Sequence, residues 1–301
     1  MAERPVRANT AALIVTWNPG DGLASRVAAL KVQVGAVLIV DNGSTELEQA
    51  RIRDVAARND ASVVVNPSNL GLGAALNQGM NQLISSGFGW VLTMDQDSSP
   101  HSDLVQRLQG AFDGYPEPER IAIIGSNYVD RNTGMLRYGL TMAHAEWIVK
   151  KTVITSGSLM SARAWQAVGP FRQEFFIDFL DHDYCIRAWL AGFVTIVVTS
   201  PVMDHAVGAA SVRTLLGKNV RTSNHAPERY YYMARNHLQF AKAYFLQEPL
   251  FVAKTVVARG LSLLIMCFFE SHVIEKLKWT GRGLWDGLRN RFPAKEVIGW
   301  P

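Results

Sequence analysis

The most informative stretch of this chain is Trp90-Val91-Leu92-Thr93-Met94-Asp95-Gln96-Asp97-Ser98-Ser99-Pro100. Its first half predicts a short buried strand, because the run is apolar and ends at turn-forming residues. Asp95 and Asp97 are one residue apart, so both carboxylates can leave the strand end on the same side. Two carboxylates this close repel each other unless a cation lies between them, and a divalent hard cation often brings a phosphorylated substrate. The alternative is an ordinary solvated turn.

Upstream of this stretch, apolar runs alternate with helical segments. The strands are expected at residues 11–16, 36–40 and 62–65, and the helices at residues 21–33, 45–59 and 70–86. This alternation predicts an α/β fold with a mostly parallel sheet and helices on both faces. Ligands bind beyond the carboxyl ends of such strands. Asp41 follows the second strand and is therefore expected to share a crevice with Asp95 and Asp97.

The second half of the chain is less regular. Further strands are expected at residues 121–125, 153–161 and 193–198, and a helix at residues 181–191. Gly157 indicates a bulge or a close approach of another segment to the backbone. After residue 226 the sequence changes to long helical stretches with many aromatic residues. We therefore expect a catalytic domain over residues 1–225 and a helical region over residues 226–301.

Composition narrows the class of protein. The 301 residues are 48% hydrophobic and 19% charged, which is typical of a folded chain. The net charge of +4 is too small to indicate nucleic-acid binding. Cys185 and Cys267 lie in apolar surroundings and are expected to be core thiols, which fits the cytoplasm. No apolar signal core follows the N-terminus, so we expect no secretory leader.

The segment from Asn69 to Gly79 is rich in glycine and includes the start of an expected helix. Gly71 and Gly73 allow the backbone to approach a ligand closely and open a helix whose N–H groups favour anions. The segment is similar to a dinucleotide fingerprint, but Leu76 occupies the third glycine position and the segment follows the third strand. We therefore reject a dinucleotide site; the alternative is a tight turn with close helix packing.

Three further segments carry candidate groups. Asp178, Asp181 and Asp183 lie in an aromatic setting where burial would strengthen a carboxylate as a general base, although Asp181 could simply cap a helix. His205 follows a strand and could bind a metal ion or be structural. Arg229 or Arg235 could meet a phosphate, with the nearby tyrosines packing on the sheet or stacking on a ligand.

Taken in order, these motifs resemble the inverting family-2 glycosyltransferases of GT-A fold, and most of all the bacterial rhamnosyltransferases that use dTDP-L-rhamnose. The resemblance covers about residues 10–240. The motifs that carry it are Val15 to Asn18, Val40 to Ser44, Asn69 with Gly71 to Gly79, Asp95 to Asp97, Ser156 to Met160, Phe176 to Arg187, His205, and Arg235 with Asn236.

The resemblance implies a donor site and a metal site. Thr16 and Asp41 would hold the nucleotide base, and Asn69 and Arg235 would belong to the donor site. Asp95 would touch the ribose. The metal ion, Mg²⁺ or Mn²⁺, would be bound by Asp97 and His205.

The resemblance also implies a catalytic base, Asp181. The commoner family pattern is Glu-Asp, whereas this chain has Leu180-Asp181. This difference points to the rhamnosyltransferase and galactofuranosyltransferase branch of the family. It also leaves Asp178 and Asp183 as alternative candidates for the base. Asp181 would take a proton from an acceptor hydroxyl, and the anomeric configuration would invert. The acceptor would be a glycan or a lipid-linked glycan of cell-surface polysaccharide such as lipopolysaccharide.

The C-terminal region has two interpretations. The uninterrupted apolar run Leu261–Phe269 is expected to be too short to cross a bilayer. Residues 271–301 hold six basic and three acidic residues beside several aromatic ones. This pattern fits an amphipathic helix at the cytoplasmic face of the inner membrane, or a helical hairpin that packs on the domain or on a second subunit of a homo-oligomer.

Two other functions stay open. A sugar phosphatase of the haloacid dehalogenase type also places two aspartates after an apolar strand, but there the strand comes early and Thr or Val occupies the place that Ser99 has here. The second alternative function is that of a catalytically inactive scaffold that binds glycans. The presence of Asp95, Asp97, Asp181 and His205 together argues against a scaffold.

Overall fold

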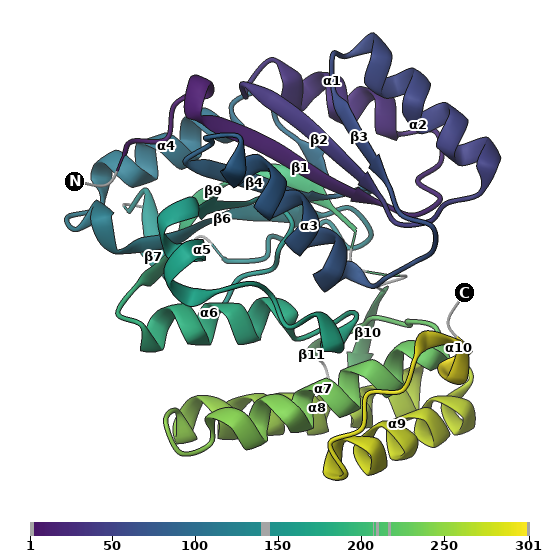
Figure 1. Cartoon of the computed structure of the whole chain (residues 1–301). Coiled ribbons are helices and arrows are strands. Elements are labelled where there is room, and N and C mark those ends of the chain that lie inside the picture. The colour runs from purple at the N-terminus through teal and green to yellow at the C-terminus, as the bar shows by residue number, and fades with distance from the viewer. Residues whose placement is uncertain (1–2, 140–144, 207, 209–210, 216–217, 300–301) are drawn as a thin grey trace. The chain divides into compact units, whose positions relative to one another are not determined.

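The computed structural model describes residues 3–139, 145–206, 208, 211–215 and 218–299. The chain forms two compact units (Figure 1). The first comprises residues 1–176 and 180–205, and the second comprises residues 177–179 and 206–301. The expected division after residue 225 and the observed division after residue 205 differ by the segment 206–225, which groups with the C-terminal helices.

The first unit is built on one mixed sheet of nine strands. Their order is β3-β2-β1-β4-β8-β6-β9-β5, and β7 pairs with β9. The strands are β1 (Thr10–Thr16), β2 (Ala36–Asp41), β3 (Ser62–Val65), β4 (Trp90–Asp95), β5 (Ser99–Pro100), β6 (Ile121–Asp130), β7 (Trp147–Val149), β8 (Ser158–Ser161) and β9 (Val194–His205).

Helices cover this sheet on both faces. They are α1 (Leu23–Lys31), α2 (Glu46–Arg58), α3 (Leu72–Ser85), α4 (Leu104–Gly114), α5 (Ala162–Val168) and α6 (Leu180–Leu190), with short 3-10 turns at Arg7–Asn9, Pro118–Arg120 and Gln173–Phe175. A crossover between parallel strands is right-handed, so α1 and α2 lie on one face of the sheet and α3 on the other. Figure 1 shows this arrangement. The expected α/β layering is therefore present.

Strands β1, β2 and β4 form because their side chains are apolar on both faces. All seven residues of β1 are buried, and β2 and β4 are buried over nearly their whole length. Such runs suit parallel strands that are covered by helices on both sides. Strands β2, β1 and β4 pair in parallel, as the alternation of elements predicts.

Beyond β4 the pairing becomes mixed. Strand β8 pairs antiparallel with both β4 and β6, while β6 and β9 are parallel. The strand expected over residues 153–161 is shorter, beginning only at Ser158, because Gly157 takes a left-handed φ of +71°. A Cβ on Gly157 would lie 2.5 Å from the sulfur of Met203, so the close approach expected at this glycine is present.

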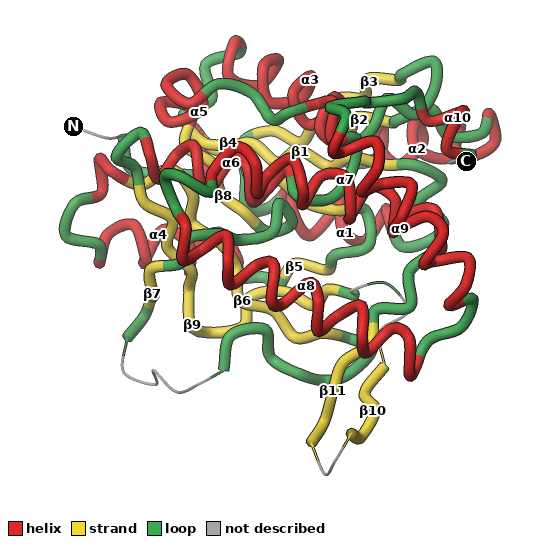
Figure 2. The backbone as a smooth tube through the Cα atoms, turned by 90° about the horizontal axis from the view of Figure 1, so that it is seen from below, coloured by secondary structure: helices red, strands yellow, loops and turns green. Residues whose placement is uncertain are grey.

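In its described part, the second unit contains a hairpin and four helices, which are labelled in Figure 2. These are β10 (Ser211–Leu215), β11 (Lys218–Thr222), α7 (Pro227–Tyr244), α8 (Pro249–Phe269), α9 (Val273–Leu288) and α10 (Lys295–Ile298). Helix α9 packs closely on α7, because Gly283 has no side chain to meet the backbone of Tyr231. One face of the C-terminal segment therefore packs within its own unit, and both interpretations of its other face stay predictions.

Helix α8 differs from the sequence expectation. The apolar run is not limited to Leu261–Phe269 but belongs to one continuous helix of 21 residues, with a mean hydropathy of 1.8 in its most apolar window. By length and composition alone this helix could cross a membrane, and only 11% of that window is buried. Cys267 is exposed on it, so the expectation of a core thiol was wrong there. Cys185 is buried, and burial raises the pKa of its thiol to about 12.

Candidate functional site

Three strand ends bring the predicted donor residues to one edge of the sheet. Thr16 is in register with Asp41 across β1 and β2, and Val15 is in register with Asp95 across β1 and β4. Neighbouring strands lie about 4.8 Å apart. The carboxyl edge of these three strands therefore presents Asp41, Thr16 and Asp95 side by side, as the sequence predicts.

The same edge holds a group that could bind a metal ion. Asp95, Asp97 and His205 each offer one ligand atom, and these atoms all lie within 4.8 Å of one another. Pairing of Ser99 with Asp204 brings the end of β9 to this edge, and Asp97 Oδ1 lies 3.8 Å from His205 Nδ1. The Asp97 side chain is 51% exposed, so a ligand can reach it. Two carboxylates and one imidazole suit a divalent cation such as Mg²⁺ or Mn²⁺.

A chain of serine hydroxyls supports this group. The backbone N–H of Asp95 donates to Ser156 Oγ at 3.0 Å, and the Ser156 and Ser98 hydroxyls lie 2.7 Å apart. Ser98 Oγ lies 2.7 Å from His205 Nδ1, and the His205 ring meets Tyr128 edge-on. Groups of this kind fix the orientation of metal ligands. Sequence reasoning missed Ser98 and Ser156 in this role, although both occur within the quoted motifs.

Gln96 lies between the two aspartates, and its side chain hydrogen-bonds their loop to the residue after β1. Its side chain accepts from the Trp17 N–H at 2.6 Å and donates to the Trp17 carbonyl at 3.1 Å. Arg26 donates to the Gln96 carbonyl at 2.7 Å, and Arg131 donates to the Asp97 carbonyl. Burial and the charge of Arg131 lower the pKa of Arg26, whereas Asp97 raises it. Two guanidinium groups thus lie beside the loop, and no sequence pattern singles them out.

Asp41 is brought to Thr16 but is fully buried. Its Oδ1 accepts from the hydroxyl of Thr16 at 3.2 Å and from the Ser44 hydroxyl, and its Oδ2 accepts from the Ser44 N–H at 3.1 Å. Asp41 therefore also holds the turn after β2. Contact of Thr16 and Asp41 with a nucleotide stays a prediction.

Asn69 shapes the entry to α3. Its side-chain oxygen accepts from the Asn42 amide at 2.9 Å and from the Gly71 N–H at 3.0 Å. Gly71 has a φ of +90°, and a Cβ there would lie 2.6 Å from the ring of Phe176. Close packing therefore explains Gly71, and a donor-site role for Asn69 stays a prediction.

The three candidate bases have different surroundings. Asp183 is fully buried, and its carboxylate accepts from Arg187 at 2.9 Å, with Arg172 3.7 Å away. Asp178 belongs to the second unit and forms a two-pronged ion pair with Arg229 at 2.9 and 3.0 Å. Burial raises the pKa of Asp178, but Arg229 outweighs it and holds that pKa below its ordinary value.

Asp181 is placed differently, near the start of α6. Its Oδ1 accepts from the backbone N–H of His182 at 2.8 Å and lies 2.9 Å from His182 Nδ1, and 19% of the side chain is exposed. Within the described residues, it forms no ion pair with an arginine. The role of Asp181 as the base stays a prediction.

Arg235 is not among the residues that the first unit brings together. It lies on α7 of the second unit, 1% exposed, with its guanidinium 4.9–5.3 Å from the ring centres of Tyr231, Tyr232 and Phe292. Its Nε donates to Asn236 Oδ1 at 2.9 Å. Arg235 is therefore a buried residue that packs within its own unit. Its predicted contact with the sugar donor stays a prediction.

Sequence comparison points to one family and one full-length relative. Residues 12–169 match the model of the family described as "Glycosyl transferase family 2". The chain is 26% identical over 297 residues to the dTDP-rhamnosyl transferase RfbF of Shigella flexneri. The alignment covers 94% of this chain and 97% of the relative.

Solved structures share the fold at low sequence identity. The S. aureus TarS fragment 1–349 in complex with UDP-GlcNAc matches with a TM-score of 0.55 and 14% identity, over 96% of this chain and 82% of that one. The mannosyltransferase PcManGT from Pyrobaculum calidifontis, in complex with GDP-Man and Mn²⁺, matches with a TM-score of 0.55 and 13% identity, over 97% and 90%. The GT-A type of α/β fold expected from the sequence is thereby confirmed.

Proposed function

The chain belongs to glycosyl transferase family 2, and we propose that it is a metal-dependent inverting enzyme that transfers L-rhamnose from dTDP-L-rhamnose. The acceptor in this proposal is a glycan or a lipid-linked glycan of cell-surface polysaccharide. That the chain is a glycosyltransferase follows from the family. The donor sugar, the acceptor and the roles of single residues are the proposed part.

One observation carries the proposed mechanism: Asp95, Asp97 and His205 converge at the edge where β1 and β2 also end. The leaving group of a nucleotide sugar is a diphosphate, which gains negative charge as the glycosidic bond breaks. A divalent ion bound there would neutralise this charge as a Lewis acid. Arg26 and Arg131, beside the same loop, would attract the diphosphate to it.

The donor is inferred from the relative. The Shigella protein is named a dTDP-rhamnosyl transferase, and the alignment runs along almost the whole of both chains. Thr16 and Asp41 would hold the thymine base, Asn69 would line the donor site, and Asp95 would contact the ribose. The family match favours transfer over the phosphatase alternative, because the matched region includes the Asp95-Gln96-Asp97 motif.

Asp181 is the proposed base. Its carboxylate would take the proton of an acceptor hydroxyl while that oxygen forms a bond to the anomeric carbon. The bond from this carbon to the diphosphate oxygen breaks at the same time, so dTDP leaves and the configuration inverts. His182, 2.9 Å from Asp181 Oδ1, would hold the carboxylate in place. We place the reaction in the cytoplasm.

Thermal shift with a panel of nucleotide sugars tests the proposal. dTDP-L-rhamnose with Mn²⁺ should raise the melting temperature by about 5 °C at saturating concentration. Comparing dTDP-glucose with UDP-glucose reports recognition of the nucleotide, because the sugar is the same. Comparing dTDP-glucose with dTDP-L-rhamnose reports recognition of the sugar, because the nucleotide is the same. A larger shift with UDP-glucose than with dTDP-L-rhamnose would overturn the proposed donor.

Product analysis separates the alternative functions. With a lipid-linked acceptor present, a transferase releases dTDP, whereas a sugar phosphatase releases inorganic phosphate from a sugar phosphate without any acceptor. An inactive scaffold would bind glycan and release neither. The Asp97→Asn variant serves as the control, since it should lose the metal-dependent part of the signal while keeping the fold.

A further inference from the structure

The outward face of α8 is an apolar stripe that the described residues of its own unit leave exposed. Its members are spaced by three, four or seven residues, so they share one side of the helix. They are Leu250, Val257, Leu261, Leu264 and Phe268, and their exposed fractions are 87%, 63%, 55%, 57% and 74%. We call them the α8 stripe. A contiguous exposed apolar surface of this kind marks an interaction site.

The opposite face of α8 is fixed to its own unit. Val252 and Met266 are buried, and the hydroxyl of Thr255 lies 3.0 Å from Nε2 of His237 on α7. The guanidinium of Arg259 lies over the ring of Tyr230. A helix that crossed a bilayer would have to give up these polar contacts or carry them into hydrocarbon. The stripe is therefore suited to lie along a surface.

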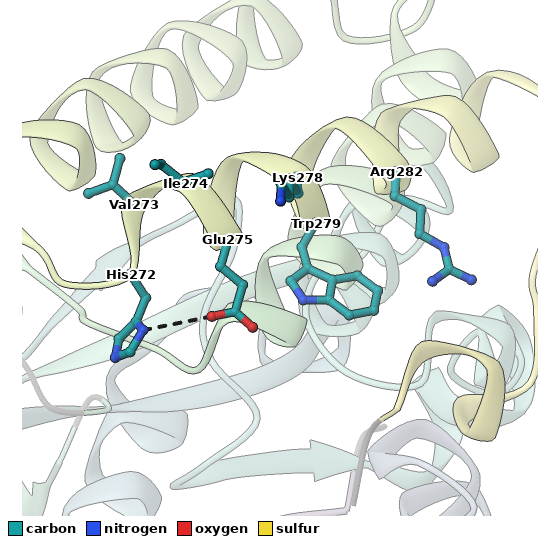
Figure 3. A pocket seen from close by; sticks show the side chains of 7 residues that line it. All are labelled: His272, Val273, Ile274, Glu275, Lys278, Trp279 and Arg282. Carbon is teal, nitrogen blue, oxygen red and sulfur yellow. Dashed lines mark ion pairs between the residues drawn. The ribbon is translucent and has the colours of Figure 1, made fainter.

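Helix α9 adds a second apolar and basic surface to the same unit. Ile274, Leu277, Leu284, Trp285 and Leu288 are exposed on it. Arg289 stacks over Trp285 at 3.8 Å, and Arg282 lies over Trp279 at 5.2 Å. Figure 3 shows His272, Glu275, Trp279 and Arg282 projecting from one side of α9 into an open pocket, which Lys278 also lines.

The exposed charge of these two helices is mainly basic. Lys276 is buried and neutralised by Glu270 at 2.8 Å, and the buried Asp286 accepts from the Tyr231 hydroxyl. Lys254, Lys278, Arg282 and Arg289 are exposed, whereas Glu275 is the one acidic side chain that is exposed among the described residues 249–289. Apolar and aromatic side chains flanked by basic ones match the boundary between headgroups and acyl chains of an anionic bilayer.

We propose that the second unit docks on an anionic lipid bilayer, with the α8 stripe and the exposed apolar residues of α9 entering the headgroup region. Lys254 favours lipid over a second copy of the chain as the partner of the α8 stripe. It lies within the stripe, four residues after Leu250, and residues 249–269 contain no acidic residue. In a dimer through the stripe Lys254 would be desolvated without an acidic partner on that helix, whereas on a bilayer it can reach lipid phosphates.

Vesicle partitioning measures this docking independently of any glycosyl transfer. The whole protein should sediment with vesicles of phosphatidylcholine and phosphatidylglycerol far more than with phosphatidylcholine alone, and high salt should release it. Leu261→Glu should reduce the partition coefficient at least tenfold. Leu47→Glu changes a leucine that is somewhat more exposed, at 65% on α2 against 55% for Leu261, and should leave partitioning unchanged. Lys278→Glu should weaken binding more than fivefold, against no change for Arg53→Glu.

A probe on Cys267 supplies a second readout. This thiol is exposed on α8 while Cys185 is buried, so an environment-sensitive fluorophore can be attached at one place. Its emission should shift to the blue with anionic vesicles. Failure to partition, or equal partitioning onto neutral vesicles, would overturn the proposal. So would a stable dimer in solution that Leu261→Glu dissociates. Donor-induced thermal shifts should be the same for Leu261→Glu and wild type, so loss of docking is distinct from failure of the proposed function.

Discussion

The candidate metal site of the first unit and the buried ion pairs of the second use charged side chains in opposite ways. In the first unit, Asp95, Asp97 and His205 offer three ligand atoms within 4.8 Å at a sheet edge, and half of the Asp97 side chain is exposed. In the second unit, Asp178 is held by Arg229, and Glu270 is held by Lys276 with both side chains at most 3% exposed.

This difference distinguishes acidic groups that can bind a ligand from acidic groups that stabilise the fold. Acidic groups that face one another favour an added cation, because positive charge between them relieves their repulsion. Acidic groups already bound to arginine or lysine have that positive charge supplied by the fold. The first unit therefore offers groups for reaction, and the second uses its charges to fix helices while it leaves an apolar face outward.

Asp181→Asn is expected to have the largest effect on this contrast. An amide cannot accept the proton of the acceptor, so turnover should fall about 10³-fold while the affinity for the donor is kept. Steady-state kinetics and donor titration measure the two quantities. Asp60→Asn, an exposed acid on another segment, should behave as wild type. Near-normal turnover of Asp181→Asn would move the base elsewhere in the molecule.

Arg229→Ala tests whether the second unit depends on its internal ion pairs. It leaves the Asp178 carboxylate largely buried without its two-pronged partner, and the free energy of unfolding should fall by about 3 kcal/mol. Urea unfolding at neutral pH measures this change. The double variant Asp178→Asn with Arg229→Leu should recover part of the loss. A change below about 0.5 kcal/mol would show that this pair is no stronger than a surface ion pair.

Acid should destabilise the second unit through His225. Burial, followed by the charge of Arg229, lowers the pKa of His225 to about 4, although Asp178 and Glu270 act in the opposite direction. An unfolded histidine titrates near 6.5, so the unfolded chain binds more protons between these values and stability falls as the pH drops through that window. Unfolding at pH 7 and pH 5 should differ by about 2 kcal/mol from this group. His225→Gln should remove that part, and an unchanged pH dependence would contradict it.

Ser98→Ala should have the smallest effect, and it tests the serine support of the metal site. The variant removes the hydroxyl 2.7 Å from His205 Nδ1 but no proposed ligand. The affinity for Mn²⁺ in the presence of dTDP should fall about tenfold. Ser102→Ala, outside the hydroxyl chain, is the matched control. Equal affinities in the two variants would show that Ser98 does not orient the histidine.

Local patterns predict the first half of the fold well. Strands β1, β2 and β4 are apolar on both faces and alternate with helices, which favours parallel pairing, and parallel pairing in turn places Asp41 and Asp95 at one edge. Helix α4 was not predicted, although Leu104, Val105, Leu108, Ala111 and Phe112 form a buried face at helical spacing. That signal was present in the sequence.

Other features depend on contacts between distant segments. The antiparallel insertion of β8 between β4 and β6 has no local signature. The hydrogen-bonded chain from Ser156 through Ser98 to His205 depends on the same insertion and on the pairing of β5 with β9. Helix α8 continues through Arg259 and Gly260 because Arg259 packs over Tyr230, which the apolar pattern alone cannot show.

Calorimetric titration of dTDP, with Mn²⁺ and with a chelator, tests the central claim most directly. If Asp95, Asp97 and His205 hold the ion that binds the donor diphosphate, Mn²⁺ should tighten dTDP binding at least tenfold in the wild type. The gain should disappear in Asp97→Asn and persist in Asp54→Asn. Equal dTDP affinity with and without Mn²⁺, or an undiminished metal effect in Asp97→Asn, would contradict the account.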